Sequence, residues 1–140
     1  MREAPELAEL MRAMYTAIEV GDQVWFEERI SAGPATLLIG SDPDEWWDGR
    51  ETALRGWRAQ LPVMAGTQLR PTRLTAFAVG DVGYAADLVE IRMPDGTEAV
   101  IRFSAVFERE GEKWKLVHSH GSVAAANEET IGREIPEAPR

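Results

Sequence analysis

Cysteine is absent from this chain of 140 residues, which excludes disulfides, thiol nucleophiles, zinc knuckles and iron–sulfur ligation. Positive charge is scarce, since 15 Lys and Arg stand against 24 Asp and Glu and the formal net charge is -9. Nucleic acids and anionic membranes are bound by clustered positive charge, so the composition predicts neither as a partner. The chain also lacks a signal-peptide-like hydrophobic region and any apolar run near the ~20 residues of a membrane span. We therefore expect a soluble cytoplasmic protein.

The length and the hydrophobic fraction of 44% fit one domain with a core of its own. Periodic patterns continue to about residue 123, so we expect a single domain over residues 1–123. Residues 124–140 lose this periodicity and collect Glu, Pro and Ala, which predicts a flexible acidic C-terminal tail.

The first part of the chain has the period of helices. Apolar residues at three- and four-residue steps predict a helix over residues 5–20, which Gly21 ends. Asp22 can cap a short second helix. The spacing of an acceptor and a glutamate in residues 48–51 is that of a capping box, so a third helix is predicted to open there and to end at Pro62.

The later part of the chain has the two-residue period of strands. A short apolar strand at residues 35–39 precedes the third helix, and four long alternating segments follow it, separated by Gly-Asp, Pro-Asp-Gly and Glu-Gly turns. The four segments span residues 67–79, 82–93, 98–108 and 113–123. Helices followed by an antiparallel meander indicate an α+β fold in which the sheet folds over the helices.

The turns also predict the register of the sheet. The Gly-Asp turn pairs Leu74 with Asp87, and the next hairpin pairs Asp87 with Phe103. A two-residue turn in the last hairpin puts His118 and His120 on the same face. That face is otherwise almost entirely apolar, so its ionisable members stand out. The opposite face is too apolar for solvent alone, which suggests an interface between two copies of the chain.

Three segments of the sequence form a recognisable set. They are Ile18-Glu19-Val20-Gly21-Asp22, Glu45-Trp46-Trp47-Asp48-Gly49-Arg50-Glu51 and Trp114-Lys115-Leu116-Val117-His118-Ser119-His120-Gly121-Ser122. With them the chain resembles the SnoaL-like group of the nuclear transport factor 2-like superfamily over residues 5–123.

The resemblance implies a curved antiparallel sheet wrapped around the N-terminal helices in a cystatin-like cone, with a conical pocket at its open end. It also implies a homodimer formed through the sheet. The superfamily includes polyketide cyclases, steroid isomerases, dehydratases and non-catalytic assembly domains, so the fold does not by itself name a reaction.

Two family residues have no counterpart here. Steroid isomerases of this fold use a tyrosine of the first helix as an oxyanion donor, where this chain has Met14 and carries Tyr15 one position later, rotated by ~100°. Kinase association domains follow the second histidine of a similar last strand with a pocket arginine, where this chain has Gly121. The second comparison leaves open that the face of Ser119 and Gly121 lines the pocket instead of the histidine face.

His118 and His120 are the only histidines and lie two positions apart on one strand. They are candidates for a catalytic acid/base pair or for ligand anchors. The alternative is that both are packed and bonded to the backbone. A metal site needs further ligands, and Asp87, two strands away and ~9–10 Å distant, is the one at hand. We predict neither a metal nor a cofactor.

Asp87 is the third candidate catalytic residue. A carboxylate between Ala85 and Val89 is costly to bury unless it is paired or protonated, and such carboxylates often mark functional clefts. The alternative is an ion pair with Arg55 or Arg58 in the helical layer.

Aromatic residues are the candidate ligand contacts. Trp46 and Trp47 are placed to wall the mouth of the pocket with flat apolar surface, unless one of them seals the core beneath its loop. Tyr15 and Phe103 complete the predicted set of ligand contacts.

The sequence therefore predicts a protein that binds a small apolar or ring-bearing molecule in a conical pocket. One alternative is an enzyme that transfers a proton in the same pocket, as an isomerase, cyclase or dehydratase, with Asp87 or His118 as general acid or base. Another is a non-catalytic assembly domain that dimerises.

Overall fold

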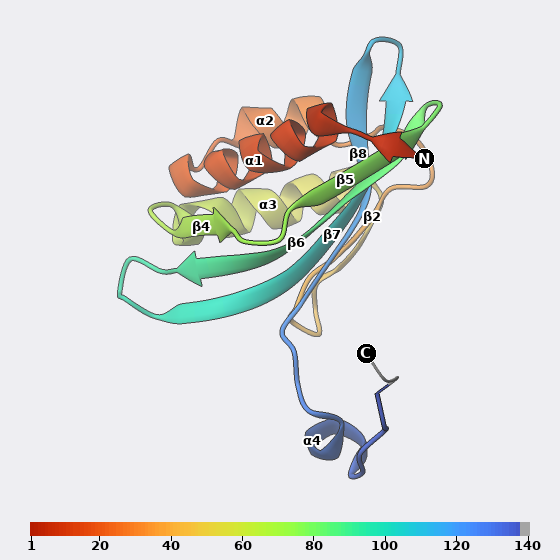
Figure 1. Cartoon of the computed structure of the whole chain (residues 1–140). Helices are drawn as coiled ribbons and strands as arrows, with labels where there is room; N and C mark the ends of the chain where they lie inside the picture. Colours follow the sequence, from red (N-terminus) through yellow and green to blue (C-terminus); the bar gives the residue numbers. More distant parts are fainter. Residues whose placement is uncertain (138–140) are drawn as a thin grey trace.

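Helices cover one face of a curved sheet (Figure 1). The computed structural model describes residues 1–137. The covering helices are α1 Pro5–Val20, α2 Gln23–Arg29 and α3 Arg50–Met64. Gly21 ends α1 in the left-handed conformation (φ 70°), and the Asp22 side chain accepts a hydrogen bond from the Trp25 amide at the start of α2. The first two helices are therefore as predicted, whereas α3 continues past Pro62.

The start of α3 differs from the capping-box prediction. Asp48 is the last residue of a strand, Gly49 (φ 89°) precedes the helix, and no side chain caps its first turn. The guanidinium of Arg50 holds this end in place, because it donates to the carbonyl oxygens of Glu27 and Ile30 at 2.7 Å each. The start of α3 is thus held by a contact between Arg50 and the end of α2, and not by a side-chain cap.

Eight strands within residues 1–137 form one open sheet. They are β1 Arg2–Glu3, β2 Leu37–Ile39, β3 Trp46–Asp48, β4 Gln68–Pro71, β5 Thr75–Val79, β6 Val82–Arg92, β7 Glu98–Glu110 and β8 Lys113–Ser122. Their order is β1-β5-β6-β7-β8-β2-β3, with β4 paired to β6 beside β5, and all pairs are antiparallel except β2 with β8. The prediction of an α+β fold with a curved sheet around the N-terminal helices is confirmed.

The predicted long strand at residues 67–79 is two strands, β4 and β5. Both pair with β6, and in β5 the predicted pairing of Ala76 with Ala85 is present. Between the two strands the chain leaves the ladder, so Leu74 is not paired with Asp87. At this break the Asp87 side chain accepts hydrogen bonds from the backbone amides of Thr72 and Arg73.

A β-bulge in β8 changes which side chains face the helices. As far as Phe107, which pairs with Leu116, the last hairpin keeps the predicted register. The next pair is Val106 with His118, so Val117 is an extra residue on β8. Because side chains alternate along a strand, one extra residue moves every later side chain to the other face.

The bulge turns Ser119 and Gly121 toward the helices and His118 and His120 away from them. Ser119 is 5% exposed, whereas His120 is exposed on the outer face. The prediction that both histidines share the helix-facing surface with Asp87 is therefore wrong. The alternation of β8 is compatible with either face, and the bulge selects between them.

The core lies between α1 and the concave face of the sheet. Leu7, Met11 and Met14 of α1 are no more than 2% exposed, and Ala78 and Ala85 of the sheet are fully buried. Small side chains on the strands allow the helix to approach closely, and the larger side chains of α1 fill the space between.

The chain leaves the body of the fold after β8 (Figure 1). It forms one short exposed helix, α4 Asn127–Ile131. Residues 138–140 of the predicted flexible tail 124–140 lie outside the described residues. None of the helices within residues 1–137 has both the length and the hydropathy that crossing a bilayer requires.

The close approach of α1 gives a test of the packing at Gly83. A Cβ at this position of β6 would overlap the Leu7 side chain and lie 2.8 Å from the Phe77 oxygen and 2.9 Å from the Ala78 Cβ. We expect Gly83→Ala to lower the free energy of unfolding by about 1–3 kcal/mol in urea denaturation. Gly121→Ala is the control, because its Cβ would meet side chains at an ordinary 3.5 Å. Equal stability of the two variants would contradict this packing.

Candidate functional site

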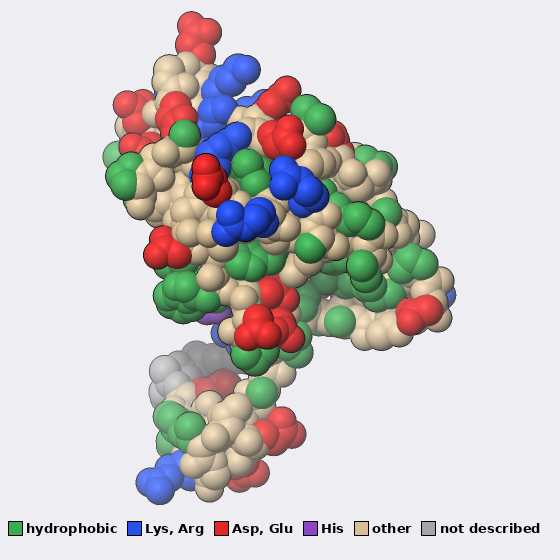
Figure 2. Space-filling view, turned by 180° about the vertical axis from the view of Figure 1, so that it is seen from behind, with side chains coloured by type: hydrophobic (Ala, Val, Ile, Leu, Met, Phe, Trp, Pro, Cys, Tyr) green, Lys and Arg blue, Asp and Glu red, His purple; other side chains and the backbone are tan. Residues whose placement is uncertain are grey.

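A cavity of about 510 Å³ lies between the concave face of the sheet and the helices α1 and α3. Apolar side chains of β6 and β7, among them Val89, Ile91 and Phe103, form its sheet wall, and Met14 and Met64 belong to its helix wall. Figure 2 shows hydrophobic side chains gathered around a hollow on the face turned away from the viewer in Figure 1. The volume is typical of pockets that hold small organic molecules.

Few polar side chains line this cavity. They are Tyr15 of α1, Gln60 of α3, Ser119 of β8, and Ser41 and Glu45 of the β2–β3 hairpin. Such a lining binds chiefly by removing apolar surface from water, and the isolated polar groups set the orientation of the ligand.

Trp47 and Trp57 form the aromatic part of the wall. Their rings meet edge to face, with centroids 5.7 Å apart and planes at 77°. Gly56 makes this contact possible, because a Cβ there would overlap the Trp47 ring. Trp57 also stacks on Phe26 at 4.3 Å, which joins the wall to the core. Trp46, by contrast, is 62% exposed and lines neither the cavity nor the core.

The β2–β3 hairpin brings a carboxylate to the cavity. Two backbone hydrogen bonds close this hairpin. The Gly40 amide donates to the Glu45 main-chain carbonyl oxygen at 2.8 Å, and the Glu45 amide donates to the Asp42 main-chain carbonyl oxygen at 3.0 Å. The Glu45 carboxylate folds back over Gly40, where any Cβ would overlap it. Glu45 is not among the pocket residues predicted from the sequence, and the signal for its position is the missing side chain of Gly40.

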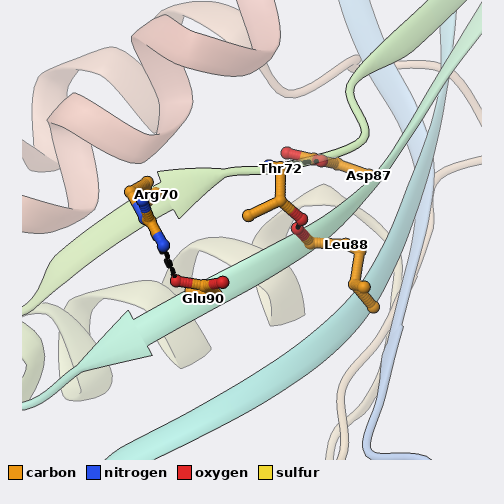
Figure 3. A network of polar contacts seen from close by, with 5 residues as sticks. All are labelled: Arg70, Thr72, Asp87, Leu88 and Glu90. Atoms are coloured by element: carbon orange, nitrogen blue, oxygen red, sulfur yellow. Dashed lines mark hydrogen bonds and ion pairs between the residues drawn. The ribbon is translucent and has the colours of Figure 1, made fainter.

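Asp87 is a buried carboxylate with three hydrogen-bond donors. The Tyr15 hydroxyl donates to its Oδ2 at 2.9 Å, and the amides of Thr72 and Arg73 donate to its Oδ1 at 3.2 and 2.8 Å. Figure 3 shows Thr72 beside both Asp87 and Leu88. The Thr72 hydroxyl donates a hydrogen bond to the Leu88 carbonyl oxygen. Asp87 is 7% exposed and does not line the cavity. Tyrosine and backbone donors take the place of the arginine partner considered from the sequence.

Tyr15 connects this carboxylate to the cavity wall. It lines the cavity and is 4% exposed, one position away from the tyrosine site expected for steroid isomerases. Burial, the charge of Asp87 and the hydrogen bond to Asp87 all raise the pKa of Tyr15 well above its ordinary value. The phenol therefore keeps its proton and acts as the donor in this pair.

The two histidines lie outside the cavity lining. His118 Nδ1 is 2.7 Å from the Leu37 carbonyl oxygen on the neighbouring strand β2, and His120 is exposed on the outer face. Within residues 1–137, no three His, Asp or Glu side chains are grouped so that they could hold a metal ion. Of the predicted catalytic residues, none lies in the cavity wall, whereas the predicted ligand contacts Tyr15, Trp47 and Phe103 do.

The Tyr15–Asp87 pair predicts a loss of stability at alkaline pH. A folded-state pKa above the ordinary 10.0 means that the contribution of Tyr15 is complete below pH 10 and is lost as the pH rises above it. In Tyr84→Phe, where Tyr15 is the one tyrosine left, phenolate absorbance should rise only together with loss of circular dichroism. Ionisation of Tyr15 in a chain that remains folded would argue against the buried pair. Tyr15→Phe, the matched control, should lack this alkaline loss.

Comparison with known proteins agrees with this architecture. A family model described as the SnoaL-like domain matches residues 7–126. A nuclear transport factor 2-like protein of unknown function from Pseudomonas putida has a similar structure, with a TM-score of 0.78 at 16% identity over 97% of this chain and 95% of that one. A search of curated proteins finds no match.

Two further solved structures share the fold. A protein with a cystatin-like fold from Caulobacter vibrioides has a TM-score of 0.71 at 16% identity, covering 89% of this chain and 92% of that one. A protein from Streptomyces avermitilis, proposed to be a dehydratase of the nuclear transport factor 2-like family, has a TM-score of 0.76 at 21% identity, covering 86% and 94%. Since the family model extends from α1 to beyond the end of β8, the chain belongs to the SnoaL-like domain family.

Proposed function

We propose that this protein binds a small, largely apolar, ring-bearing molecule in the cavity between the sheet and the helices. The observation that carries the proposal is the cavity itself, about 510 Å³ of space with an apolar wall and few polar side chains. Burial of an apolar ligand there gains roughly 25 cal/mol for each Å² removed from water, before the cost of association is subtracted. The edge-to-face pair of Trp47 and Trp57 offers flat surface to a ring.

Proton transfer in the same cavity is the second function that the sequence predicts. The geometry favours binding over a reaction carried by Asp87, because its carboxylate is occupied by Tyr15 and two backbone amides. It equally favours binding over a reaction carried by His118, which lies outside the lining. A general base has to reach the proton that it removes.

The proposal is tested with Nile red, a neutral ring-bearing dye that fluoresces in apolar surroundings. We expect one dye per chain, displaced by other apolar molecules. Gly121→Leu should weaken its binding at least about tenfold, because Gly121 lines the cavity and a leucine there fills part of it. The measurement is a fluorescence titration at constant protein concentration.

Gly121→Ala is the matched control, since it adds only one methyl group at ordinary contact distance. Circular dichroism and the thermal midpoint establish that both variants are folded. Unchanged dye binding by a folded Gly121→Leu would place the dye outside the cavity and contradict the proposal.

We also propose that two copies of the chain associate through the outer face of the sheet. Phe77 and Tyr84 stack on this face with ring centroids 6.0 Å apart, and Tyr84 remains 37% exposed. A hollow of about 590 Å³, lined in part by Arg70 and Glu90, continues the same face along β4, β6 and β7. Exposed aromatic surface next to polar side chains is typical of an interface that excludes water at its centre.

Light scattering tests this association. The native protein should have a mass in solution of twice the 15.6 kDa of one chain. Tyr84→Glu should shift the equilibrium toward the monomer, because it would bury a charge at the contact. Val24→Glu is the control, because Val24 is an exposed apolar residue of α2, away from the sheet. A monomeric native chain, or equal effects of the two substitutions, would contradict the outer face as the interface.

A further inference from the structure

The charge of the cavity lining has one sign. Glu45 and Tyr15 are the ionisable side chains that line it, and no Lys, Arg or His among residues 1–137 does so. Tyr15 keeps its proton and donates a hydrogen bond to Asp87. Within the described part of the chain, Glu45 therefore contributes the one charge in the lining, and that charge is negative.

The Glu45 carboxylate has no partner within the described part of the chain. It accepts no hydrogen bond and forms no ion pair there, although it is partly buried over Gly40. Asp42 and Asp44 of the same hairpin are exposed and have the same sign, and Figure 2 shows acidic side chains close to the hollow. Charges of one sign around a cleft with apolar walls raise the local concentration of oppositely charged ligands.

The aromatic wall is suited to the same kind of ligand. Trp47 lies on β3, two residues after Glu45 in the sequence. The ring of Trp57 contacts the ring of Trp47 in the cavity wall. The face of a tryptophan ring attracts an ammonium group, and attraction increases where water is excluded. A carboxylate or phosphate on the ligand would lose its hydration in an apolar cavity and meet the Glu45 charge, so the same wall disfavours anions.

We propose that the molecule held in this cavity is an amphiphilic amine, with its ring against the apolar wall and its protonated nitrogen paired with Glu45. The inference rests on the proposed binding function and specifies its ligand class. Neutral ligands of the same shape bind more weakly, because they leave the carboxylate unpaired at the edge of the cavity.

The test uses three probes of matched shape and different charge: phenylbutylamine, phenylbutanol and phenylbutyrate. Each is measured at neutral pH and low salt by its displacement of Nile red. We expect the amine to bind about fivefold more tightly than the alcohol and the acid to bind most weakly, an effect of the size of one partly exposed ion pair. Raising the salt concentration should reduce this difference.

Glu45→Gln should remove the preference for the amine and leave the affinity for the alcohol unchanged. Asp44→Asn is the matched control, because it removes one negative charge from the same hairpin at a side chain outside the lining. It should keep most of the preference. An equal loss of the amine preference in the two variants would mean that the summed negative charge of the hairpin selects the ligand. That result would overturn the proposed ion pair between the amine and Glu45.

The outcomes for the two proposals are distinct. If Nile red binds in the cavity and the three probes compete equally, the binding function stands and the amine inference is wrong. The same holds if the acid competes best. If Gly121→Leu leaves Nile red binding unchanged in a folded protein, the cavity is not the binding site and both proposals fail.

Discussion

The buried carboxylate of Asp87 joins three parts of the fold, namely β6, the helix α1 and the segment between β4 and β5. Its oxygens accept hydrogen bonds from Tyr15 on α1 and from the amides of Thr72 and Arg73 between β4 and β5. A buried carboxylate without such donors costs several kcal/mol, so α1 and the strand break are held in one arrangement around β6. Tyr15 lines the cavity, and the position of this part of its wall depends on the same interaction.

Much of the fold could be predicted from local patterns, because helix period and hairpin turns act over short distances. The pairing of Ala76 with Ala85 and of Asp87 with Phe103 follows from the turns alone. The bulge at Val117 could not be predicted in this way, since either face of the later part of β8 is compatible with its alternation. The packed structure selects the face with small side chains, which leaves room for the cavity.

The candidate site was accessible to sequence reasoning only where side chains themselves carry the signal. The type and position of the aromatic residues Tyr15, Trp47 and Phe103 predict them as ligand contacts, and all three line the cavity. Glu45 was missed because its place depends on the empty space above Gly40. The apolar neighbours of Asp87 in the sequence predict its burial, but its donors, a helix tyrosine and two loop amides, depend on tertiary contacts that no local pattern encodes.

The parallel pairing of β2 with β8 has a consequence for how the protein reaches this structure. The His118 ring and the Leu37 carbonyl that meet there are 81 positions apart in sequence, whereas the hairpins of β5 to β8 join neighbouring segments. Contacts between distant segments cost more loop entropy and form late in folding. The β2–β3 hairpin, with Glu45 and Trp47, is therefore expected to dock last, so that the mouth of the cavity takes shape only after the rest of the cone is in place.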